Sequence, residues 1–390
     1  MKKDWRPSKR ILEIKKSAIH EMTYLSKKLD DVAFLSWAKP TSDTPEHIKS
    51  GAITAIKSGK VGGYSENKGL VSLREEIAKK LKRDNHINAD PSQIMVTVGA
   101  IEGISAAIMA LIDPGDEVIL PSPTYSTHIR QVLLASAKPI LIPTIEEEGF
   151  SLDLNGIKKA ITAKTKAIVY CSPSNPTGAV FSEKTLRQLA NIALDNNLLI
   201  ITDEAYEYFT YDDATHFSIG SIPEMKQQVV SCFTFTKTYA MTGWRIGYLQ
   251  TDESLIPQIE KAHIPFAICA PVVSQYAALE ALKGSQDCIK QFRNHYLSMR
   301  NVMCNRLNEL DFVFEYKKPQ GSYLMFPKIV AKGGEDSTSF CKNLLKEARV
   351  STTPGIAFGP EGEQHLRLSF CVSEKEIHKA FDRMEHYCRH

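Results

Sequence analysis

The stretch TFTKTYAMTGWRIGY, residues 234–248, combines an amine and a guanidinium within one short segment. Lys237 lies among the hydroxyl side chains of threonines, and Arg245 follows eight residues later. A lysine amine acts as a nucleophile or base when its pKa is lowered, and a guanidinium binds phosphate or carboxylate groups through parallel hydrogen bonds. Gly243 and Gly247 let the backbone approach a bound group closely. These residue types suit chemistry that needs an amine beside an anion-binding group.

Other residues that can bind ligands follow apolar runs elsewhere in the sequence. Gly99 and Ala100 come after IMVTV and open a helical pattern, and backbone N–H groups at a helix start can bind an anion. Asp203 ends LLIITD, where a buried carboxylate needs a cationic or protonated partner. Tyr125 follows another apolar run, and Asn175 lies between two nearby prolines in SPSNPTG. Each of these signals alone is also explained by packing or by a rigid turn.

The elements that must position these residues alternate between strands and helices. Helical patterns at 102–112 and 183–197 lie between apolar runs that predict strands at 94–98, 116–120, 138–143, 166–171, 198–203, 229–235 and 246–250. This alternation predicts an α/β fold with a mostly parallel seven-stranded sheet between helices. Ligands collect at the carboxyl ends of the strands in such sheets, where the polar residues named above lie.

The chain length predicts one large and one smaller domain. We expect the large domain, which would bind a cofactor, at residues 46–290. A smaller α+β domain would form from residues 1–45 and 291–390. Between about 272 and 310 a long helical pattern carries no strand signal.

The composition excludes several functional classes. With 48 Lys plus Arg against 45 Asp plus Glu, the net charge of +3 gives no reason to expect a nucleic-acid partner. The sequence contains no apolar run of membrane-spanning length and no signal-peptide pattern, so we expect neither a membrane partner nor secretion. The eight cysteines form no CxxC pair, which argues against a metal site or a disulfide framework. A cytoplasmic location fits these features best.

Ten segments, in order along the chain, resemble the motifs of the class I and II aminotransferases. These are pyridoxal-phosphate enzymes with the aspartate aminotransferase fold, also called fold type I. A single motif is a weak signal, but ten in the family's order are specific. They are LSWAKPTSDTPEHI (35–48), YSENKGLVSLREEI (64–77), VTVGAIEGI (96–104), IDPGDEVILPSPTY (112–125), SPSNPTGAVFS (172–182), DEAY (203–206), TKTYAMTGWRIGY (236–248), PQGSYLMFP (319–327), PGIAFGPEG (354–362) and HLRLSF (365–370).

The resemblance implies roles for individual residues. Lys237 matches the lysine that bonds pyridoxal 5'-phosphate and later carries a proton to and from the substrate. Asp203 matches the partner of the pyridine nitrogen, and Arg245 matches the phosphate-binding arginine. Lys237, Asp203 and Tyr206 are the implied catalytic residues. The other implied cofactor contacts are Gly99, Ala100, Tyr125, Asn175, Tyr206 and Thr234.

The resemblance also implies a homodimer and a substrate site. Tyr64 matches a tyrosine that reaches the cofactor phosphate of the partner subunit, so the two active sites would be shared. Arg367 matches the arginine that binds the substrate α-carboxylate as a bidentate pair, beside Asn175.

Three positions depart from the family pattern and bear on substrate choice. Ala38 replaces a common glycine whose N–H helps to hold the α-carboxylate. Lys39 replaces a residue that is often acidic, and is either a reader of a side-chain carboxylate or an exposed loop lysine. Ile101 stands where some aspartate-using relatives have a lysine. Because a buried carboxylate without a partner is costly, a neutral or aromatic substrate side chain is expected against an apolar wall of Trp37, Ile101 and either Phe266 or Ile268.

The predicted function is transfer of an amino group from an α-amino acid to a 2-oxo acid, such as 2-oxoglutarate, by a ping-pong mechanism. A carbon–sulfur β-lyase of the same fold needs the same residues and is the first alternative. A non-catalytic ligand sensor is the alternative from another class. A nicotinamide-binding sheet has less support, because no GxGxxG follows the first strand of the sheet.

Overall fold

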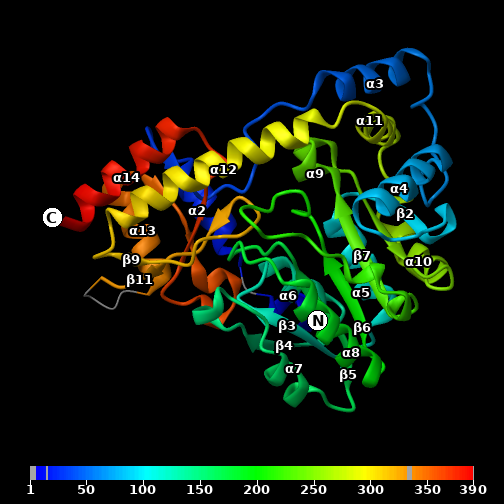
Figure 1. Cartoon of the computed structure of the whole chain (residues 1–390), viewed down its shortest axis with the longest axis horizontal. Helices are drawn as coiled ribbons and strands as arrows, with labels where there is room; N and C mark the ends of the chain where they lie inside the picture. The colour runs from blue at the N-terminus through cyan, green and yellow to red at the C-terminus, as the bar shows by residue number, and fades with distance from the viewer. Residues whose placement is uncertain (1–5, 15, 332–335, 390) are drawn as a thin grey trace, which may run out of the picture.

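The computed structural model describes residues 6–14, 16–331 and 336–389, and its centre is a seven-stranded sheet (Figure 1). All neighbouring strands are parallel except at β8, which is antiparallel to both β2 and β7. The α/β fold class and all seven predicted strands are therefore confirmed. In order across the sheet the strands are β2 (Ile94–Thr97), β8 (Gly247–Thr251), β7 (Val229–Thr234), β6 (Leu199–Asp203), β5 (Thr165–Cys171), β3 (Glu117–Ser122) and β4 (Lys138–Pro143).

Helices cover both faces of this sheet because its central strands are apolar on both sides. Ile168 and Ile200 pack on one face with α7 (Leu154–Ala160) and α8 (Glu183–Asp195). Val169 and Ile201, their neighbours in sequence, pack on the opposite face with α5 (Ala100–Leu111), α6 (Ser126–Leu134) and α10 (Ile256–Ala267). Successive strand side chains point to opposite faces, so a continuous apolar run builds both layers of core.

A second core joins the two ends of the chain. Strand β1 (Ala33–Phe34) pairs in parallel with β12 (Val350–Ser351), and α2 (Ala18–Ser26) packs against α13 (Ser337–Ala348). Met22 is buried in the same cluster as Met303, Phe340 and Phe381. The division at residues 46 and 290 stays a prediction, and residues 1–5, 15, 332–335 and 390 lie outside the described part. The other elements here are α14 (Glu374–Arg389), β9 (Phe314–Glu315), β10 (Leu324–Met325), β11 (Lys328–Ile329), β13 (Thr353–Pro354) and β14 (Leu366–Ser369).

The long helical pattern near 272–310 forms two helices, α11 (Val272–Lys283) and α12 (Asp287–Asn308). Gly284 separates them in an extended conformation, and a Cβ at this position would lie 2.4 Å from His47 Cδ2. Close packing against His47 of α3 (Glu46–Lys57) therefore leaves no room for a side chain at this position. The remaining helices are α1 (Lys9–Glu13), α4 (Val71–Asp84) and the short α9 (Phe235–Thr238).

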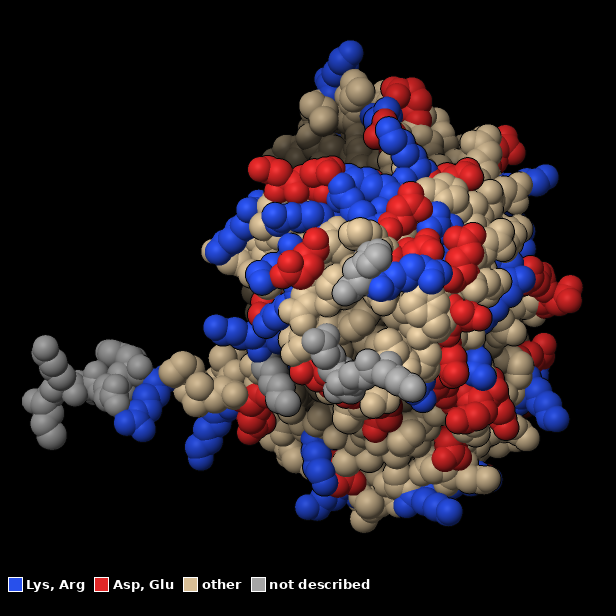
Figure 2. All heavy atoms as spheres, turned by 90° about the vertical axis from the view of Figure 1, so that its left-hand side faces the viewer, with Lys and Arg blue, Asp and Glu red and all other residues tan. Residues whose placement is uncertain are grey.

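Basic and acidic side chains are interspersed on the face shown in Figure 2. Ion pairs such as Lys379 with Asp31 (2.6 Å) and Arg306 with Asp382 (2.8 Å) neutralise neighbouring charges near α12 and α14. Within residues 6–14, 16–331 and 336–389, no helix has both the length and the apolar character that crossing a membrane requires.

Candidate active site

A cavity of about 380 Å³ opens where the carboxyl ends of the central strands face the chain segment at residues 36–39. It brings together residues that are far apart in the sequence, as expected for a parallel sheet. The cavity is also lined by Lys39. Of the predicted site residues, Tyr64, Phe266 and Ile268 do not line it. Those that do are Trp37, Ala38, Gly99, Ala100, Ile101, Tyr125, Asn175, Asp203, Tyr206, Thr234, Lys237, Arg245 and Arg367.

One end of the cavity is built to bind an anion. Gly99 precedes α5 with φ of +79°, and a Cβ there would lie 2.8 Å from Arg245 Nη2. The guanidinium therefore lies directly beside the helix start, where N–H groups lack helical partners. A Cβ at Gly247 would lie 2.6 Å from the Ala100 nitrogen, so both glycines permit this close approach. Thr234, whose hydroxyl accepts from the backbone N–H of Thr236 at 3.2 Å, completes this end.

Lys237 is a half-buried residue whose amine lies inside the cavity. It follows β7 on the short helix α9, and Nζ donates a hydrogen bond to the Ala38 carbonyl at 2.9 Å. Burial, with contributions from the Arg367 and Arg245 cations, lowers the pKa of the amine from 10.5 to about 8. A substantial share of the amine is therefore neutral near physiological pH, as a nucleophile or base requires. The Tyr323 hydroxyl donates to the same carbonyl at 3.0 Å.

Asp203 ends β6 with its side chain held from two directions. Its Oδ1 accepts a hydrogen bond from the Ala205 N–H at 3.1 Å, and Oδ2 lies 3.2 Å from Nε2 of the buried His128. These contacts fix a carboxylate in the floor of the cavity. We did not predict His128 from the sequence, although its place three residues after Tyr125, near the start of α6, was a usable signal. The rings of Tyr125 and His128 pack edge to face, with their centroids 5.4 Å apart.

Arg367 enters the opposite side of the cavity from β14 and is fully enclosed. Its Nη2 donates to the Ser36 carbonyl at 2.6 Å, and Nη1 donates to Asn175 Oδ1 at 3.4 Å. Within the described residues its Nε has no hydrogen-bond partner, and burial lowers the pKa of the guanidinium. A buried cation whose contacts are neutral is stabilised by an anionic ligand, and a guanidinium suits a carboxylate.

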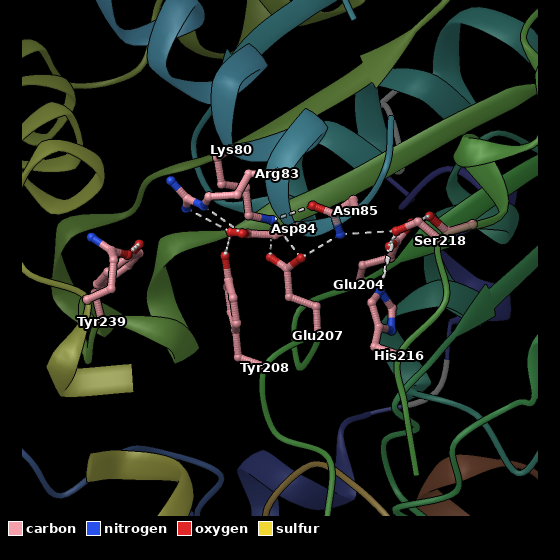
Figure 3. A network of polar contacts seen from close by, with 12 residues as sticks. Lys80, Arg83, Asp84, Asn85, Glu204, Glu207, Tyr208, His216, Ser218 and Tyr239 are labelled. Carbon is pink, nitrogen blue, oxygen red and sulfur yellow. Dashed lines mark hydrogen bonds and ion pairs between the residues drawn. The ribbon is translucent and has the colours of Figure 1, made fainter. Parts of the chain in front are cut away.

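A buried polar network contacts the loop that follows β6 (Figure 3). Lys80 Nζ on α4 lies 2.6 Å from both carboxylate oxygens of Glu207 and 2.8 Å from Asn85 Oδ1. The side chains of this ion pair are only 4% and 6% exposed. Asn85 also donates to Glu207 at 2.8 Å and to Ser218 at 3.1 Å, and Ser218 donates to Glu204.

This network and the cavity share one short segment of chain. Glu204 and Glu207 contact the network, whereas Asp203 and Tyr206 line the cavity. Because their backbone is continuous, the buried ion pair holds the loop on which the two cavity residues lie.

Some predicted residues lie outside the cavity of this chain. Tyr64 is 80% exposed and does not line it. Phe266 and Ile268 are 66% and 43% exposed, and in their place Ile19 and Ile104 complete the apolar lining beside Trp37 and Ile101. Ile19 comes from α2, whose sequence gave no signal of a role in the site. Gln131, Thr236 and Thr242 also line the cavity.

The sequence matches the family described as "Aminotransferase class I and II" over residues 31–384. It is 38% identical over 385 residues to an aspartate aminotransferase of Pyrococcus abyssi, with 98% of each chain covered. It is 37% identical over 381 residues to aromatic-amino-acid aminotransferase 2 of Thermococcus litoralis, with 97% of each chain covered. The structure superimposes on aspartate aminotransferase from Thermus thermophilus with maleate with a TM-score of 0.92 at 31% identity, covering 98% of this chain and 100% of that chain.

Proposed function

Because the chain belongs to the class I and II aminotransferases and is therefore an amino-group-transferring enzyme, we propose that it uses pyridoxal 5'-phosphate to move an amino group from an α-amino acid to 2-oxoglutarate. Members of this family are generally dependent on pyridoxal phosphate. The observation that carries the proposal is one cavity holding a buried amine, a fixed carboxylate and two anion-binding arginines: Lys237, Asp203, Arg245 and Arg367.

The donor set of the cavity fits pyridoxal phosphate. Arg245, Thr234 and the start of α5 would hold the phosphate, because they offer a guanidinium, a hydroxyl and free N–H groups at one end. Tyr125 would stack on the ring, and Asn175 with Tyr206 would contact its phenolic oxygen. When bound, the cofactor supplies a reactive carbonyl and an electron sink conjugated to the substrate Cα.

Lys237 would act as nucleophile and proton carrier. Burial lowers its pKa to about 8, so the neutral amine is accessible without strongly alkaline conditions. Its hydrogen bond to the Ala38 carbonyl at 2.9 Å orients Nζ toward the segment at 36–39. A proton removed from the substrate Cα would rest on this amine until it is returned at a different atom.

Asp203 would keep a proton on the ring nitrogen, and Arg367 would bind the substrate α-carboxylate. The carboxylate of Asp203 has only 11% of its side chain exposed, so water competes weakly for it. Nε of Arg367 has no described partner and, together with one terminal nitrogen, can form the two parallel bonds that a carboxylate accepts. Ala38 also lines the cavity.

The apolar lining supports neutral or aromatic amino donors. Trp37, Ile101, Ile19 and Ile104 line the cavity, and a donor carboxylate against this wall would lose hydration. The names of similar proteins include both aspartate and aromatic aminotransferases, so the donor needs measurement. The amino-transfer rates of aspartate, phenylalanine, methionine and alanine decide it, and a wide preference for aspartate would contradict the proposed donor class.

We also propose a homodimer with shared active sites, located in the cytoplasm. Tyr64 is 80% exposed, and Ile53 and Ile56 on the preceding α3 are 47% and 55% exposed, a surface that a partner subunit would cover. The eight cysteines are free thiols, a state that a reducing compartment maintains. Light scattering of the purified protein tests the dimer, because a stable monomer under assay conditions would contradict it.

Amino transfer itself is tested by supplying each donor with 2-oxoglutarate and measuring glutamate. We expect glutamate to form with at least one neutral or aromatic donor. Cystathionine supplied without a 2-oxo acid tests the β-lyase alternative through release of pyruvate. No glutamate with any donor, with the cofactor present, would overturn the proposed function and favour a ligand sensor.

A further inference from the structure

The charges that line the cavity leave one cation without an assigned ligand. In the proposed function Arg245 binds phosphate, Lys237 bonds the cofactor, and Arg367 binds the α-carboxylate. Lys39 also lines the cavity but has no such role. Among the described residues that line it, Asp203 is the only acidic one, and it would be occupied by the ring nitrogen. Lys39 can therefore pair with one more negative charge on a ligand, beyond the cofactor phosphate and the α-carboxylate.

The backbone that carries Lys39 is held by the residues of the active site. Arg367 Nη2 donates to the Ser36 carbonyl at 2.6 Å, and Lys237 Nζ donates to the Ala38 carbonyl at 2.9 Å. Ser36 and Lys39 are three residues apart, so their backbones are separated by at most roughly 10 Å. Arg367, which would bind the α-carboxylate, is therefore hydrogen-bonded to the same short segment that carries Lys39.

The surroundings of Lys39 leave its ammonium group available. No described carboxylate forms an ion pair with it, and its side chain is exposed at the rim between this cavity and a neighbouring one of about 700 Å³. Its own carbonyl accepts a hydrogen bond from Cys371 Sγ at 3.2 Å, which fixes the residue at its base. The lining contributed by Trp37 and Ile101 is apolar, and Lys39 is the cation of the lining that the proposed function leaves without a ligand.

We propose that Lys39 binds the distal carboxylate of a five-carbon dicarboxylate substrate, 2-oxoglutarate or glutamate, whose α-carboxylate is bound by Arg367. This inference rests on the proposed function and adds a specificity residue to it. Ile101 stands in the cavity wall where some aspartate-using relatives have a lysine. Lys39 would supply the missing cation from the rim of the cavity.

The rim position explains how one cavity serves two unlike substrates. A neutral or aromatic donor packs on Trp37 and Ile101 and leaves Lys39 hydrated, which costs little because its side chain is exposed. A buried lysine in the same place would be left unpaired by every neutral donor and would exclude it. The dicarboxylate gains a charge-assisted hydrogen bond at its far end.

The test compares two non-reacting ligands that differ only in the distal carboxylate, glutarate and valerate, by calorimetric titration of the holoenzyme. We expect wild type to prefer glutarate, and Lys39→Met to reduce that preference by about tenfold, the lower end of what a hydrogen bond between charged groups contributes. Lys39→Arg should retain the preference. Lys184→Met, which removes an exposed lysine on α8 outside the cavity, is the matched control and should change nothing.

Each outcome bears on the inference separately from the proposed function. An unchanged preference in Lys39→Met, or an equal loss of both ligands, would overturn the role of Lys39 while transamination with pyruvate as acceptor still supported the proposed function. In the supporting case, the KM for 2-oxoglutarate rises in Lys39→Met and the KM for pyruvate does not. Failure of wild type to transaminate any 2-oxo acid would overturn the proposed function itself.

Discussion

The buried amine of Lys237 makes a quantitative prediction about how cofactor binding depends on pH. Burial lowers the pKa of this amine from 10.5 to about 8. Since only the neutral amine attacks an aldehyde, the rate of covalent binding should follow the neutral fraction. At pH 7 about one tenth of an amine with a pKa of about 8 is neutral, against roughly one in three thousand with the ordinary value of 10.5.

The assay mixes cofactor-free protein with saturating pyridoxal phosphate between about pH 7 and about pH 10, and follows the visible absorbance. We expect the rate to rise about tenfold and to level off above a midpoint near 8. Lys237→Ala is the control, and it should retain no covalently bound cofactor after reduction with borohydride at any pH.

Two results would refute this reasoning. A rate that continues to rise through pH 10 would mean that the reacting amine has an ordinary pKa, so burial does not activate it. Reduction that labels a lysine other than Lys237, identified by peptide mass, would mean that the nucleophile is misassigned.

Three further predictions concern the groups around this amine. In cofactor-free protein the buried charge destabilises the fold by about 3 kcal/mol below pH 8 relative to Lys237→Met. Because the folded-state pKa is the lower one, this deficit should shrink as pH rises from about 8 toward 10.5, and a constant deficit in denaturant unfolding would contradict it. Lys80→Met leaves the Glu207 carboxylate buried and unpaired, which should cost about 3–5 kcal/mol, and adding Glu207→Leu should recover most of the loss; a double variant as unstable as the single one would argue against the ion pair. Asp203→Ala should lower kcat far more than Tyr206→Phe, since a protonated ring nitrogen drives the chemistry, and equal losses would mean that the partner of this nitrogen is misassigned.

Much of the fold was predictable from the sequence because its strands carry a strong, local signal. The seven strands of the central sheet are apolar and lie close to their predicted bounds, for example 229–235 against Val229–Thr234. The motifs that follow them indicated the family, which the match over residues 31–384 confirms. Since parallel strands end at one edge of a sheet, predicting the strands also predicted which residues meet in the cavity.

Features that depend on contacts distant in sequence were harder to predict. Ile19 lines the cavity from α2, which packs against β13 from the other end of the chain, and nothing in its own segment indicates that position. The sequence around Lys39 allowed two interpretations, an exposed loop residue or a residue that binds a side-chain carboxylate. The structure shows that Lys39 is exposed and also lines the cavity. The close contact of Gly284 with the side chain of His47 forms across a helix interface between residues far apart in the sequence. The predicted role of Tyr64 depends on a second copy of the chain, which the structure of one chain does not test.

The most direct test of amino transfer in this cavity is the visible absorbance of the purified protein, alone and after adding single amino acids. We expect a bound chromophore that shifts with neutral or aromatic amino acids and returns when 2-oxoglutarate is added, with glutamate as the product. A protein that shows no chromophore after pyridoxal phosphate is supplied, or one whose chromophore does not respond to any amino acid, would contradict the account.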